Sequence, residues 1–187
     1  MPRLPMGDMG PCEIVWKYGE SGSINLGPFL DGVKLRADTS VHDIKEDRAG
    51  DVAVDAVFGG TVYELETPMI RSTLEQLNEV LLAGGIQTSG SLEYIYLKNQ
   101  IGCFMYDLAS ALVIKPICGN VVSTDPSEWT HLYKCYPISA LDLSWAPATQ
   151  RIFPVTWKVF VSQESGYEGY FGTLGMESGS TEFGERE

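Results

Sequence analysis

Hydrophobic and polar residues alternate through most of the chain, which is the pattern of half-buried β-strands. Near the N-terminus, Ile14 and Trp16 share one face of such a segment. Near the C-terminus, Val155, Trp157 and Val159 line up in the same way. Further strands are expected at residues 31–38, 92–98, 111–117 and 131–145. The alternation therefore predicts a mostly β protein.

One segment combines a charged stretch with a strand. It runs from His42 to Gly60 and has five charged residues within seven positions near its start. Clean alternation follows at 52–58, then a glycine pair, then a second alternating run at 61–66. Two strands around two glycines predict a β-hairpin whose turn lies at Gly59 and Gly60.

A single segment has helical periodicity. Its apolar residues recur every three or four positions, at Ile70, Leu74, Leu77 and Leu81. Thr67 is a suitable N-cap with Pro68 at the first helical position, and Gly84 and Gly85 supply the end. The predicted helix spans about residues 68–83, and its one apolar face places it against a sheet. The expected fold is an antiparallel β-sandwich or barrel with one flanking helix.

Composition adds the domain organisation and excludes one class of function. The chain has 187 residues, a formal net charge of −12 and a pI near 4.5. It has no cluster of Lys and Arg, so binding of nucleic acid by phosphate neutralisation is not expected. Residues 1–11 are predicted to form an N-terminal arm, 12–162 the β domain, and 163–187 a C-terminal arm rich in Gly, Ser and Glu.

No enzyme signature is found. The chain has neither a serine elbow nor a phosphate-binding loop. His131 and Cys135 are four residues apart, and on one strand face they could share a metal ion, although a third ligand is missing. The Asp residues at 43, 47 and 51 are too widely spaced for a calcium loop. We therefore predict no catalytic, cofactor or metal site, and no apolar run approaches the ~20 residues of a membrane span.

Several short motifs, taken in order, resemble the bacteriophage tail tube (major tail protein) family. They are Leu26-Gly27, Gly32-Val33-Lys34-Leu35, the set His42, Asp43, Ile44, Asp47, Gly50, Val54, Asp55 and Gly59, then "LVIKP", and finally "YPISALDLSW" followed by "RIFPVT". The similarity covers roughly residues 14–162. The C-terminal arm lies beyond the family pattern.

The resemblance implies a virion protein of the tail, assembled in the host cytoplasm. Its subunits would form hexameric rings that stack into a tube, and DNA would leave the capsid through the lumen without specific binding. Candidate partners besides the protein itself are sheath, tape measure, terminator and baseplate proteins. Because opposite charges set register at an interface, a charged loop suits contact between rings. The residues expected in this assembly loop are His42, Asp43, Lys45, Glu46, Asp47, Arg48 and Asp51.

The lumen of such a tube is expected to be negatively charged, because a like-charged wall does not hold DNA. Its candidate residues are Asp51, Asp55, Glu64 and Glu66, which alternate with apolar residues. Two alternatives stay open. One is a tail terminator or baseplate ring protein on the same fold, and the other is a β-sandwich that binds a carbohydrate or a receptor.

Overall fold

The computed structural model describes residues 11–27, 29, 32–45, 53–70, 72–81, 85–97, 101–139 and 153–175. Strands dominate these ranges, together with one short helix and one 3-10 turn. In chain order the elements are β1 (Cys12–Trp16), β2 (Ile24–Leu26), β3 (Lys34–Lys45), β4 (Ala53–Met69), α1 (Leu74–Val80), β5 (Ile86–Ser89), β6 (Leu92–Ile95), β7 (Ser110–Cys118), β8 (Val121–Val122), η1 (Pro126–Glu128), β9 (Thr130–Ser139), β10 (Phe153–Phe160) and β11 (Gly172–Leu174). The prediction of a mostly β fold with one helix is confirmed.

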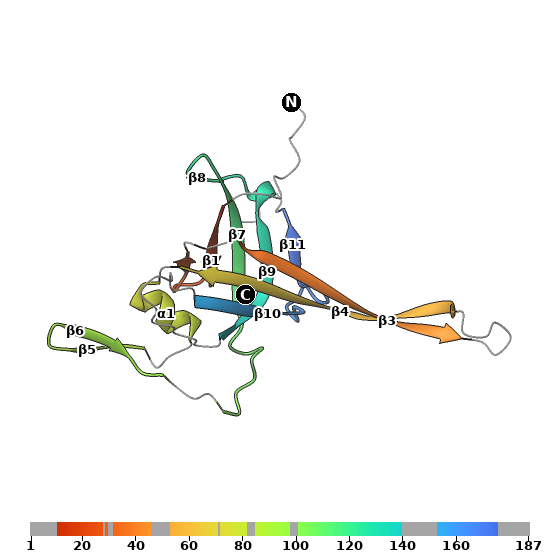
Figure 1. The fold of residues 1–187 in the computed structure, drawn as a ribbon, viewed down its shortest axis with the longest axis horizontal. Coiled ribbons are helices and arrows are strands. Elements are labelled where there is room, and N and C mark those ends of the chain that lie inside the picture. The colour runs from red at the N-terminus through yellow and green to blue at the C-terminus, as the bar shows by residue number, and fades with distance from the viewer. Residues whose placement is uncertain are drawn as a thin grey trace, which may run out of the picture.

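Nine strands form one open antiparallel sheet (Figure 1). Its order is β2-β1-β7-β9-β10-β4-β3, while β11 pairs with β9 and β8 with β7. Strands β5 and β6 form a separate hairpin. The predicted alternation of the last long strand is confirmed, because Val155, Trp157 and Val159 of β10 are all buried.

The sheet curls tightly enough for distant strands to touch across its concave face. Trp16 of β1 and Trp157 of β10 have ring centroids 5.1 Å apart in an edge-to-face arrangement. In a flat sheet these two strands would lie about 14 Å apart, since each step between strands is ~4.8 Å. An isolated bridge between Phe29 and Met69 also joins the chain beyond β2 to β4. The sheet is therefore open in its strand order yet encloses a core as a barrel does.

The helix begins later than the sequence predicted. Residues 67 and 68 belong to β4, where Pro68 lies opposite Pro154 of β10. Thr67 is buried and accepts a hydrogen bond from Trp157 Nε1 at 2.9 Å, so a side chain 90 residues away holds it in the sheet. The true N-cap is Thr73, which forms a capping box with Gln76. Val80 is the buried residue of this short helix.

The glycine pair is a β-bulge rather than a turn. Strand β4 continues through it, and β3 pairs with β4 along its whole length. The pair Ser40–Gly60 is followed by Val41–Phe58, so β4 has one extra residue, Gly59. A Cβ on Gly59 would lie 2.4 Å from Ser40 Oγ, and Gly60 has a φ of 125°. The positive φ of Gly60 favours glycine, a side chain at Gly59 would displace that of Ser40, and the real hairpin joins β3 to β4.

Part of the predicted C-terminal arm belongs to the domain. Strand β11 pairs with the N-terminal half of β9, and the Phe171 ring lies 4.7 Å from the Tyr63 ring. Tyr167 packs on Tyr133 with ring centroids 4.8 Å apart. Residues up to 175 therefore pack on the domain whose predicted boundary lies after residue 162. Residues 176–187, and residues 1–10 of the predicted N-terminal arm, lie outside the described residues.

Candidate functional site

The β3–β4 hairpin extends beyond the body of the sheet (Figure 1). Strand β10 pairs with β4 only from Tyr63 to Met69. Residues 53–62 of β4 therefore have β3 as their single neighbour, over about 33 Å at ~3.3 Å per residue. Every residue of β3 is exposed to solvent. A two-stranded ribbon of this kind has little stability of its own in water, so a hairpin this long is unusual in an isolated domain.

The predicted charged residues belong to the far end of this hairpin. His42, Asp43 and Lys45 are exposed among the last residues of β3. The other members of the predicted assembly loop, Glu46, Asp47, Arg48 and Asp51, lie outside the described residues. The strands on either side of this segment pair with each other as a hairpin, and the assembly role of its charges stays a prediction.

The ribbon also exposes large apolar side chains, which the sequence reasoning missed. Val41 is 55% exposed and Phe58 is 65% exposed, and the two lie directly opposite each other on one face. On the other face, Val57 lies opposite His42, and Ile44 lies opposite Asp55. Such a pair on a ribbon with no other neighbour is available for contact with another protein surface.

Three of the candidate lumen residues, Asp55, Glu64 and Glu66, fall on one face because of the bulge, and the fourth, Asp51, lies outside the described residues. Asp55 and Glu64 are nine positions apart and would point to opposite faces of a regular strand. The extra residue Gly59 brings them to the same face. Cations share this face, since Arg36 lies opposite Glu64 and its Nη1 lies 3.2 Å from Glu66 Oε1. The negative lumen stays a prediction, with these carboxylates partly neutralised by their neighbours.

The possible metal pair of His131 and Cys135 is not assembled. A register irregularity in β9 puts Cys135 with the core residue Leu132 on one face, whereas His131 pairs with Val113 on the other. The expectation that the two share a face is therefore wrong. Within the described ranges, no group of three His, Cys, Asp or Glu residues is placed to hold a metal ion.

Acid should destabilise the fold through His131. This side chain is fully buried between the rings of Tyr18 and Tyr133, and burial lowers its pKa from 6.5 to about 4. The folded protein therefore prefers neutral imidazole, so stability is fully present above pH 6.5 and is lost as the pH falls toward 4. Between pH 7 and pH 5 we expect a loss of about 2 kcal/mol from this residue. Urea unfolding at both pH values should show a smaller loss in His131→Gln, and an equal loss in both proteins would contradict the assignment.

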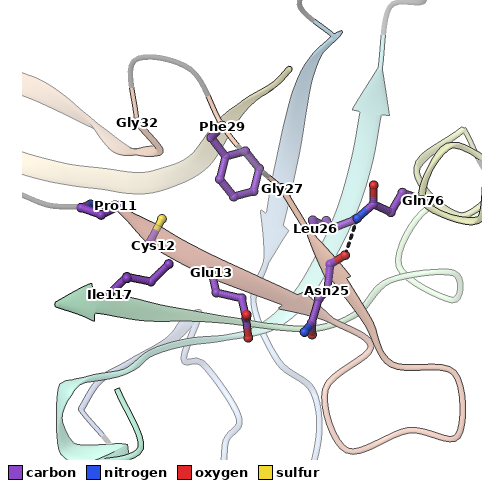
Figure 2. A pocket seen from close by; sticks show the side chains of 10 residues that line it. All are labelled: Pro11, Cys12, Glu13, Asn25, Leu26, Gly27, Phe29, Gly32, Gln76 and Ile117. Atoms are coloured by element: carbon purple, nitrogen blue, oxygen red, sulfur yellow. Dashed lines mark hydrogen bonds between the residues drawn. The ribbon is translucent and has the colours of Figure 1, made fainter. Parts of the chain in front are cut away.

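A hollow of about 630 Å³ lies beside β2 and α1 (Figure 2). Apolar side chains, including Leu26, Phe29 and Ile117, form much of its lining. Gln76 Nε2 donates a hydrogen bond to the Asn25 carbonyl at 2.7 Å. Burial raises the pKa of the Cys12 thiol to about 11, so the thiol is protonated at neutral pH and is a poor nucleophile. The Cys12 thiol is therefore no nucleophile for this hollow, whose lining also includes Glu13.

No model of a known protein family matches the chain, and no curated protein matches it. The one helix in the part of the chain that the structure describes is too short to cross a membrane. All four cysteines are free thiols.

Proposed function

We propose that this protein is a structural subunit of a bacteriophage tail tube, assembling into hexameric rings that stack around a DNA conduit. The observation that supports this most is the free part of the β3–β4 hairpin. It leaves the body of the sheet, exposes the apolar pair Val41 and Phe58, and leads into a highly charged segment. A monomeric protein gains nothing from such a ribbon, whereas a polymer gains an intersubunit contact.

The position of the hairpin favours a head-to-tail contact. It projects from one end of the molecule (Figure 1), where it can reach a different surface on the next copy. Heterologous contacts of this type generate rings when the rotation closes and filaments when it does not. The net charge of −12 opposes association of the subunits, and salt weakens that repulsion. The six-fold symmetry and the DNA conduit are features that the resemblance to the tail tube family implies. The fold alone does not define them.

Negative-stain electron microscopy of the purified protein tests the proposal. We expect hexameric rings and stacked tubes, more numerous at higher salt. Single rings that never stack would favour the tail terminator or baseplate alternative. Monomers or trimers across salt and protein concentrations would contradict a tube subunit and favour a carbohydrate- or receptor-binding domain.

A further inference from the structure

Along the chain between α1 and β7 lies a second stretch with many exposed apolar side chains. It is formed by the described residues 92–97 and 101–108, which we call the apolar segment. Eight large hydrophobic side chains in it are exposed: Leu92, Tyr94, Tyr96, Leu97, Ile101, Phe104, Met105 and Leu108. Ile101 is 85% exposed and Phe104 is 77% exposed, higher than any hydrophobic residue of the hairpin. Within the chain described, nothing covers these side chains.

Internal contacts anchor the C-terminal end of the apolar segment, at residues 105–108, to the body of the domain. Tyr106 packs on Phe160 of β10 at 6.1 Å between ring centroids. Its hydroxyl accepts a hydrogen bond from the Gln163 amide at 2.9 Å. The Ala109 and Leu108 amides bond to the carbonyls of Tyr106 and Met105 in a tight turn. Because this end is already anchored, a partner would bind it with less loss of conformational entropy than it would a free loop.

The summed apolar area of the segment is comparable to what an interface needs. Three of the eight side chains are aromatic and carry ~150–250 Å² each, so the eight together expose on the order of 600 Å² of apolar surface. A specific interface buries ~800 Å² per partner, and the polar rim supplies the remainder.

The same chain carries a surface of matching character at its other end. The hairpin of β5 and β6 lies opposite the described end of the β3–β4 hairpin in Figure 1. We propose that the apolar segment binds the Val41–Phe58 face of the β3–β4 hairpin of a second copy. This inference rests on the proposed self-assembly and identifies the receiving surface. Each copy then uses one surface to bind and the other to be bound, as a head-to-tail contact requires.

Cross-linking through Cys103 tests this contact, because this exposed thiol lies within the apolar segment. Cys118 is also exposed and is replaced by serine in every variant. Ala56→Cys adds a thiol on the hairpin face of Phe58, two positions along β4. With a short bismaleimide linker, we expect a ladder of chains longer than a dimer. The matched controls are Val57→Cys, on the opposite hairpin face, and Ala56→Cys combined with Cys103→Ser; both should give at least fivefold less ladder.

Each outcome of this experiment decides a different point. Tubes seen by microscopy without a Cys103-dependent ladder would overturn the contact and leave the proposed function standing. A ladder without rings or tubes would support the contact and contradict the tube. Dimers alone would indicate an isologous contact through Cys103 and overturn the inference, and neither tubes nor ladder would overturn both proposals.

Discussion

Replacing Trp157 with alanine should remove a large share of the protein's free energy of unfolding. Trp157 has no exposed surface, packs on Trp16 across the curled sheet, and donates a hydrogen bond to Thr67. Truncating a buried tryptophan costs about 3–5 kcal/mol, and a domain of this size has only about 5–15 kcal/mol in total. The loss should be near the upper end, because Thr67 loses its donor and two distant strands lose their contact. Urea unfolding followed by far-UV circular dichroism measures the change.

Trp129→Ala is the matched control. Trp129 is partly exposed and lies outside the core, where its Nε1 donates to the Ser123 carbonyl and Lys115 Nζ lies 4.3 Å from its ring centroid. We expect a loss of less than about 3 kcal/mol there, because the side chain is only partly buried and lies outside the core cluster. Equal losses in the two variants would mean that the contact between β1 and β10 is not central to stability.

The strands could be predicted from sequence because their pattern is local. Trp157 and its neighbours alternate in and out of a core, and that period is visible without knowing the partner strands. The curl of the sheet was not predictable in the same way. It depends on Trp16 meeting Trp157, which are 141 positions apart, and no local pattern encodes that contact.

The error at the helix has a physical cause. A threonine followed by proline is a common helix start, so Thr67 and Pro68 have the local features of one. In the structure the buried Thr67 hydroxyl donates to the Val155 carbonyl and accepts from Trp157, and these long-range bonds keep the chain extended. The true signal was also local. Thr73 and Gln76 have the spacing of a capping box, and that motif was overlooked.

The hairpin was located only in part. A glycine pair between alternating runs fits either a turn or a bulge, and the choice depends on the partner strand. Here β3 runs past the pair, so Gly59 becomes the extra residue. The charged end was evident from composition, whereas the exposure of Phe58 was not. Phe58 is exposed because β10 stops pairing with β4 at Tyr63, so residues 53–62 of β4 have no neighbour other than β3. This depends on the packing of distant strands, which the local sequence does not show.

Replacing Phe58 with serine should abolish assembly at ordinary protein concentrations while leaving the fold intact. Phe58 is 65% exposed, so a subunit contact could bury about 100 Å² of its ring. At ~25 cal/mol per Å² this corresponds to about 2.5 kcal/mol for each contact, or roughly a 100-fold rise in the concentration needed for polymerisation. Since the side chain makes no core contact, the free energy of unfolding should change by less than about 0.5 kcal/mol. Sedimentation velocity across a concentration series measures the assembly threshold.

Val57→Ser is the control for which face of the hairpin binds. Val57 is the next residue, is exposed to a similar degree, and lies on the opposite face beside His42. Its apolar area is smaller and its cross-strand neighbour is polar, so this face should be the weaker candidate for burial against another subunit. We expect the threshold to rise less than about tenfold in this variant. Loss of an apolar side chain should raise the assembly threshold strongly only on the face that contacts the other subunit. Equal thresholds in the two variants, or a higher threshold in Val57→Ser, would therefore mean that the hairpin does not bind through Val41 and Phe58.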